Sequence, residues 1–364
     1  MKKTNLIVFL LLILLSSQIQ AQFSQGLNKT EALDLIKLSY YPYILQKGGD
    51  SLMRAELPNY EIVIVRDSVA MDNAWSVIKT ANKGIISFRG TTPNPISWME
   101  NFYSAMIPAK GQMILPNGKH VNYKFAEDPR AGIQTGWSLS IMIMQTEIIR
   151  EIKKLNDQNI YDIYITGHSQ GGALSLLFTS FLVNLPAGIL SKQNQYKTYA
   201  FAAPKPGNRF FSYEYSKRSN TQLNSYTFIN PYDWVPQTPF TVQSPSNITT
   251  LNPFLEFEKS KEGSFVKRIA LNHIYGSMVN PIKKAQKNLN KNLGNRVNKI
   301  IVKEIGEFQV PEYMMDAAYF PVGTSIILEQ YLPALNPENE KDIFWQHMPY
   351  QYIKLINDYF NEND

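Results

Sequence analysis

The sequence predicts an α/β fold, with a mostly parallel central sheet, helices on both faces and an insertion before the last strand. Two observations predict it. Short apolar stretches suited to buried strands alternate with longer stretches whose apolar residues recur every three or four positions, as in helices. The alternation stops between Phe240 and Phe320, so we interpret residues 240–320 as the insertion.

The first 21 residues have the pattern of a cleavable secretory signal peptide. Lys2 and Lys3 precede the apolar run Leu6 to Leu15, and small and polar residues follow up to Ala21. A stable membrane-spanning helix needs about 20 apolar residues, more than this run offers. We therefore predict an exported chain, periplasmic or extracellular, with a single domain over residues 22–364.

The predicted elements follow in chain order. A short amphipathic helix is expected from Lys29 to Tyr41. The expected strands are Glu61 to Val65, Ala74 to Thr80, Gly84 to Phe88, Asp162 to Thr166, Thr198 to Ala202, Ser225 to Ile229 and Ser325 to Leu328. The later expected helices are Trp137 to Leu155, Gly171 to Asn184 and His347 to Phe360. Strands that alternate with helices in this way indicate a parallel sheet.

The insertion contains a basic amphipathic stretch from Pro281 to Ile305. Its apolar residues fall on one side of a helix, lysines and arginine cover the rest, and a break is expected at Gly294. Two interpretations stay open. The helix packs on the domain and keeps a solvated basic face, or it contacts a membrane surface.

Composition limits the partners. The chain has no cysteine, which excludes disulfides, thiolate metal sites and a lipid anchor on cysteine. The formal net charge is +6, and removal of the two lysines of the signal peptide leaves 6 − 2 = +4. This mild excess suits anionic surfaces. It does not indicate nucleic-acid binding, and nothing in the composition indicates an oligomeric state.

The most specific motif is Gly167-His168-Ser169-Gln170-Gly171. The bare Gly-x-Ser-x-Gly pattern is weak evidence, but here it follows an apolar strand and opens an apolar helix. In that setting a strained turn lifts a serine hydroxyl clear of the sheet, and a side chain in place of either glycine would crowd the turn. Ser169 is the predicted nucleophile.

A serine hydroxyl needs a base, and the chain has four histidines. The side chain of His168 is expected to point away from Ser169, and His120 precedes the serine, against the chain order of such sites. We favour His347, which follows the last strand and opens the last helix, and keep His273 of the insertion as the alternative.

The acid that orients the base is expected in a turn after a strand downstream of the serine. Asp233 fits, because it lies just beyond the strand Ser225 to Ile229 between Pro231 and Pro236. The alternative is a plain turn aspartate. Backbone N–H donors must also face the developing oxyanion. Gln170 is one candidate, and Thr91, just after the strand Gly84 to Phe88, is the second.

Together these segments resemble the class 3 lipases, the fungal-lipase-like family of α/β-hydrolases. The segments that carry the resemblance are Ile85 to Thr91, Ile165 to Leu174, Phe201 to Asn208, Asp233 to Pro236, and His347 before Tyr350. The resemblance implies an α/β-hydrolase fold. It also implies a catalytic triad of Ser169, Asp233 and His347, with Thr91 and Gln170 as oxyanion donors.

The resemblance further implies a lid from Pro93 to Met106 that exposes Trp98 and Phe102 on opening. The chain departs from the family at Gln134-Thr135-Gly136-Trp137, where a His-x-Gly-Phe is usual, and we expect this to change local packing only. The basic insertion is a second departure, because it lengthens the path from Asp233 to His347.

We expect hydrolysis of carboxylic esters, acylglycerols foremost, through an acyl-serine intermediate, without metal or cofactor. A phospholipase A1 or a carboxylesterase of the feruloyl type would use the same residues. An inactive module that binds lipid or polymer is the alternative of another class. The expected partners are an ester or lipid substrate and a lipid surface in transient contact.

Overall fold

A computed structural model describes residues 25–41, 50–219, 224–248, 265–329 and 335–363. The leader expected over residues 1–21 lies outside these ranges, so it stays a prediction, as does the single domain. Among the described residues, no helix combines the length and apolar character that crossing a bilayer requires.

The central sheet has seven strands in the order β1-β2-β3-β8-β9-β11-β13. The four pairs from β3 to β13 are parallel, and β1 and β2 add antiparallel strands at one edge. The strands are β1 (Glu61–Val69), β2 (Asn73–Lys79), β3 (Lys83–Phe88), β8 (Asp162–His168), β9 (Gln195–Phe201), β11 (Asn224–Ile229) and β13 (Thr324–Ile327). This confirms the predicted mostly parallel sheet.

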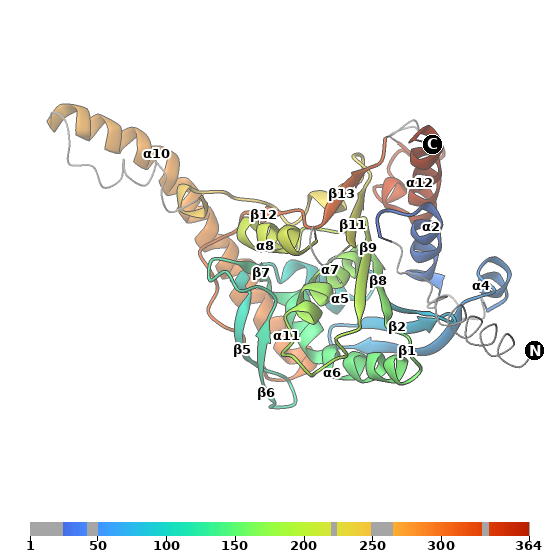
Figure 1. Cartoon of the computed structure of the whole chain (residues 1–364). Coiled ribbons are helices and arrows are strands. Elements are labelled where there is room, and N and C mark those ends of the chain that lie inside the picture. The colour runs from blue at the N-terminus through green and yellow to red at the C-terminus, as the bar shows by residue number, and fades with distance from the viewer. Residues whose placement is uncertain (1–24, 42–49, 220–223, 249–264, 330–334, 364) are drawn as a thin grey trace, which may run out of the picture.

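Helices cover both faces of this sheet (Figure 1). The helices are α2 (Lys29–Leu38), α4 (Asp50–Glu56), α5 (Pro95–Phe102), α6 (Thr135–Asp157), α7 (Gln170–Val183), α8 (Arg209–Ser219), α10 (Phe265–Leu289), α11 (Val297–Ile305) and α12 (Pro349–Asn363). Short strands form two further sheets: β12 (Tyr319–Phe320), β10 (Gly207–Asn208), β7 (Gly132–Gln134) and β4 (Met106–Pro108) in one, and β5 (Lys110–Ile114) and β6 (His120–Lys124) in the other.

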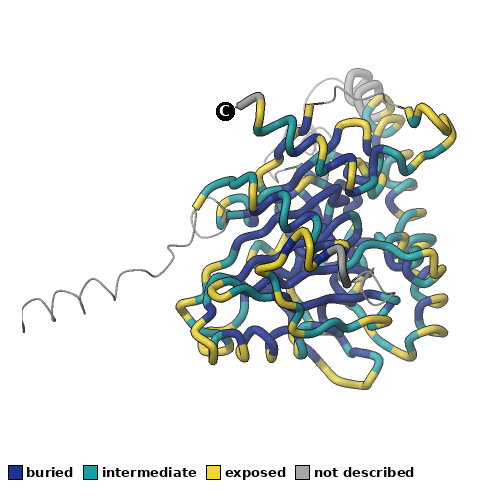
Figure 2. The backbone as a smooth tube through the Cα atoms, turned by 90° about the vertical axis from the view of Figure 1, so that its right-hand side faces the viewer, coloured by how far each residue is buried: buried dark blue, intermediate teal, exposed yellow. Residues whose placement is uncertain are grey.

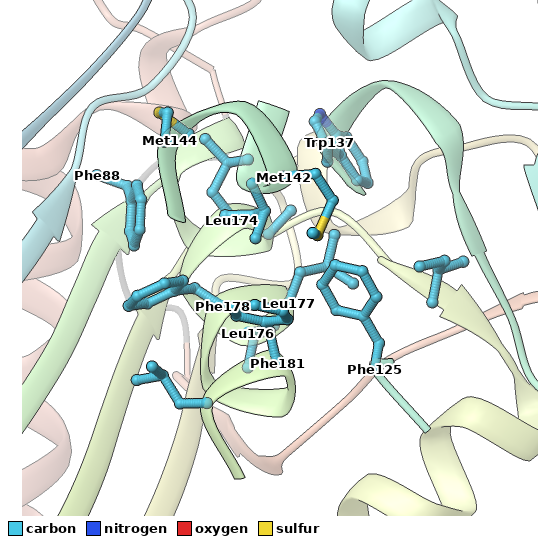
Figure 3. Close-up of a cluster of buried hydrophobic side chains, with 14 of the residues drawn as sticks. Phe88, Phe125, Trp137, Met142, Met144, Leu174, Leu176, Leu177, Phe178 and Phe181 are labelled. Atoms are coloured by element: carbon cyan, nitrogen blue, oxygen red, sulfur yellow. The ribbon is translucent and has the colours of Figure 1, made fainter. Parts of the chain in front are cut away.

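The molecule has one hydrophobic core on each face of the central sheet. Neighbouring side chains of a strand point to opposite faces, so one strand can contribute to both cores. In β8, Ile163 and Ile165 join the core under α6 and α7, whereas Tyr164 packs in the second core under α2 and α12. Figure 2 shows the buried backbone gathered at the centre of the molecule. Figure 3 shows the first core, where Phe178 of α7 packs edge-on against Phe88 of β3. The first core therefore holds α7 against the sheet.

The helix of the insertion differs from the sequence prediction in where it begins and in its continuity. The helix begins at Phe265 and not at Pro281, which lies inside α10 although proline prefers a first turn. Gly294 does not break it: a π-helical stretch, Asn290–Arg296, joins α10 to α11. A Cβ at Gly294 would lie 2.6 Å from the ring of Tyr313, so close packing explains this glycine. The described residues of this span add no strand to the central sheet.

Candidate active site

Ser169 lies in the sharp turn between β8 and α7. Its backbone has φ of +60°, a region that side chains disfavour. The flanking glycines make this turn possible. A Cβ at Gly167 would lie 2.2 Å from the carbonyl oxygen of Gly171, and one at Gly171 would lie 2.2 Å from that of Phe88. The predicted steric role of both glycines is confirmed.

Asp233 and His347 meet at the same edge of the sheet. Asp233 follows β11 and is 1% exposed, and its Oδ1 accepts a hydrogen bond from the backbone N–H of Val235. His347 ends a 3₁₀ turn, Trp345–His347, after β13. The last helix begins only at Pro349, so His347 precedes that helix and does not open it.

The structure brings these three side chains into one hydrogen-bonded row. His347 Nε2 lies 2.8 Å from Ser169 Oγ, and His347 Nδ1 lies 2.7 Å from Asp233 Oδ2. His273 is exposed on α10 and His120 is exposed on β6. Among the described residues, His347 is the one histidine whose side chain hydrogen-bonds the hydroxyl of Ser169.

Three buried residues that sequence reasoning did not assign to the site support this row. The hydroxyl of Tyr352, on α12, donates to Asp233 Oδ2 at 2.8 Å. His168 Nε2 lies 2.8 Å from the carbonyl oxygen of His347, which can only accept. Burial lowers the pKa of His168 well below its usual value, so the ring is neutral and donates that bond. The amide of Asn230 also donates to the carbonyl oxygen of Gln346, beside His347.

The predicted oxyanion segment packs directly against the serine turn. The hydroxyl of Thr91 donates to Gln170 Oε1 at 2.9 Å, and Asn101 Nδ2 donates to the Thr91 hydroxyl at 2.8 Å. Gly90 permits the approach, because a Cβ there would lie 3.0 Å from the carbonyl oxygen of His168. Gln170 is the first residue of α7, where a backbone N–H has no partner within the helix.

Helix α5, within the segment expected to form a lid, is held by buried contacts. Gln134 Nε2 donates to the carbonyl oxygen of Glu100, and Gln134 Oε1 accepts from the N–H of Trp137. The Glu100 side chain is fully buried and accepts a hydrogen bond from Asn73. Gln134, where the sequence departs from the family pattern, therefore ties α5 to α6. Opening of the lid stays a prediction.

The row opens into a cleft of about 1410 Å³. Ser169, His347, Gln170 and Thr91 line it, and most of the remaining surface is aromatic or apolar. The aromatic lining residues are Tyr40, Trp98, Phe102, Trp137, Trp234, Phe240 and Phe344. Such a lining suits an apolar substrate with a few polar groups at one end.

The fold and the site define an α/β-hydrolase. Residues 85–243 match the family model Lipase (class 3), so this segment of the chain is similar to the class 3 lipases. The predicted resemblance is confirmed.

Three solved lipase structures are similar to this chain. M37 lipase is 18% identical, with 91% of this chain and 93% of that one covered and a TM-score of 0.53. The lipase from Rhizopus microsporus var. chinensis is 19% identical, covering 58% of this chain and 68% of that one, with a TM-score of 0.42. Lipase II from Rhizopus niveus is 19% identical, covering 58% and 73%, with a TM-score of 0.43. Only the first supports the fold argument. No curated protein matches the chain by sequence.

Proposed function

We propose that this chain hydrolyses carboxylic esters through an acyl-serine intermediate on Ser169, and that acylglycerols are its substrates. The observation that carries the proposal is the unbroken row from Ser169 through His347 to Asp233, with distances of 2.8 and 2.7 Å. The nucleophile, its base and the group that orients the base stand in the order the reaction requires.

In the proposed reaction, His347 Nε2 takes the proton as Ser169 Oγ attacks the ester carbonyl. Asp233 holds the imidazole in the tautomer with its proton on Nδ1 and stabilises the imidazolium. The backbone N–H groups of Gln170 and Thr91 hydrogen-bond the oxyanion. The imidazolium then returns its proton to the leaving alcohol. Water, activated by the same imidazole, attacks the acyl-serine and releases the acid.

The apolar lining of the cleft favours a long acyl chain over an acetyl group. Each methylene group that the cleft buries contributes roughly 0.8 kcal/mol to the free energy of binding. For p-nitrophenyl esters from acetate to palmitate, we expect kcat/KM for the octanoate to exceed that for the acetate at least tenfold. Ser169→Ala is the control for background hydrolysis. A preference for acetate would contradict the acylglycerol substrate and favour a carboxylesterase. A folded protein inactive on every ester would favour the non-enzymatic binding module.

Measuring hydrolysis of triacylglycerol and of phospholipid by the same protein distinguishes a lipase from a phospholipase A1. The proposal predicts faster release of fatty acid from triacylglycerol.

We also propose that the chain is exported, which the leader pattern of residues 1–21 supports. If the leader is cleaved as proposed, N-terminal sequencing of the secreted protein begins at Gln22, and an N-terminus at Met1 would refute it.

A further inference from the structure

The segment from His273 to Lys303 is called the basic arm below. It comprises α10 from His273 onward, the π-helical stretch and α11 as far as Lys303. The outer part of α10 stands clear of the rest of the molecule (Figure 1). Further along, the basic arm returns to the body, where Val297 and Ile301 are buried in the core. At this return Leu293 lines the cleft, and its carbonyl oxygen accepts a hydrogen bond from the N–H of Ala105. The basic arm is thus attached at the edge of the proposed active site.

The basic arm carries positive charge alone. It contains seven lysines and arginines and no aspartate or glutamate. Six of these side chains are exposed and form no ion pair with any residue that the structure describes; they are Lys284, Lys287, Lys291, Arg296, Lys299 and Lys303. They form two groups spaced by three and four residues, the spacing that places side chains on one side of a helix. A packed helix with an ordinary solvated face usually mixes both signs of charge.

Exposed apolar side chains accompany these charges. Ile274 and Met278, four residues apart on α10, are 57% and 61% exposed, and Ile300 on α11 is 46% exposed. At the cleft, Phe240 is 80% exposed. A polyanion in water would use the cations but leave these apolar groups in solvent. The boundary of a lipid layer satisfies both kinds of group at once.

We propose that the basic arm docks the enzyme on an anionic lipid surface and brings the cleft next to it. Cations close to such a surface bind its headgroups, and apolar side chains enter the layer beneath them. The substrate class is then an ester lipid presented among anionic headgroups. This inference rests on the proposed ester hydrolysis for its meaning, but docking can be measured without turnover.

The test uses the full chain carrying Ser169→Ala, so that vesicles stay intact. Co-sedimentation is measured with vesicles of phosphatidylcholine alone and of phosphatidylcholine with one part in three phosphatidylglycerol. In the same background, Lys284→Glu, Lys287→Glu and Lys291→Glu are combined. The matched control combines Lys119→Glu, Lys153→Glu and Lys192→Glu, three exposed lysines outside the basic arm that change the net charge equally.

We expect the anionic vesicles to bind the unsubstituted arm at least tenfold more tightly than the neutral ones. The arm triple should weaken that binding by roughly 100-fold and the control triple by less than threefold, since each surface cation contributes about fivefold. Equal binding to both vesicles, or equal loss in both triples, would overturn the proposal. So would retention on heparin with no binding to anionic vesicles, which would assign the basic arm to a polyanion.

A separate measurement keeps this inference distinct from the proposed reaction. With Ser169 restored, both triples should hydrolyse p-nitrophenyl butyrate, a soluble ester, at the unsubstituted rate. Failure of the docking proposal leaves that rate intact. Failure of the proposed function removes hydrolysis in the unsubstituted chain, whatever the vesicles show.

Discussion

Replacing His347 with alanine is expected to lower kcat/KM for a soluble ester by roughly 10⁴- to 10⁶-fold. The imidazole is the group in contact with Ser169 Oγ, so without it the hydroxyl keeps its proton and cannot attack. The residual activity would come from the oxyanion donors and from substrate binding. The measurement is steady-state hydrolysis of p-nitrophenyl butyrate at neutral pH.

His273→Ala is the matched control, because this histidine was the alternative base and lies exposed on α10. It should retain the unsubstituted kcat/KM within about twofold, as exposed positions usually do. If His273→Ala lost most of the activity while His347→Ala kept it, the base would have been assigned to the wrong residue.

Replacing Glu100 with glutamine is expected to change how stability depends on pH. Burial raises the pKa of Glu100 to about 8, from an ordinary value of 4.5 for a glutamate. Between these two values the folded chain holds a proton that the unfolded chain releases. The contribution of Glu100 to the free energy of unfolding therefore falls as pH rises from about 4.5 to 8 and is constant outside this range. The pKa difference corresponds to roughly 5 kcal/mol over this window.

Glu100→Gln keeps the shape of the protonated side chain and removes the titration. Its free energy of unfolding should lack the fall that Glu100 contributes, so relative to the unsubstituted chain the variant should gain stability as pH rises from 4.5 to 8. Urea unfolding at pH 4.5, 6 and 8 measures this. Parallel profiles for the two proteins would mean that Glu100 is already ionised at neutral pH in the folded state.

The sheet could be predicted because its signals are local. Strands of the parallel region appear in the sequence as short apolar runs. Gly167 is required by a contact with Gly171 in the same turn, whereas Gly171 is required by the approach of Phe88 on the neighbouring strand β3. Asp233 and His347 could be found for a related reason: each follows a strand, and parallel strands bring such loops to one edge.

What the sequence did not predict depends on how distant elements dock. Tyr352 reaches Asp233 only because α12 packs beside α2 over the sheet, and His168 reaches the His347 carbonyl only through the same packing. No spacing along the chain encodes these contacts. The course of α10 was missed because Pro281 carries the signal of a helix start, and the structure continues the helix through it.

The central claim is that Ser169 is an activated nucleophile, and labelling with a fluorophosphonate tests it most directly. The reagent phosphonylates only serines whose hydroxyl is activated by a neighbouring base. We predict one label per chain, mapped by peptide mass to the segment containing Ser169, and no label on Ser169→Ala. A folded chain that takes up no label, or takes it up at another residue, would contradict the account.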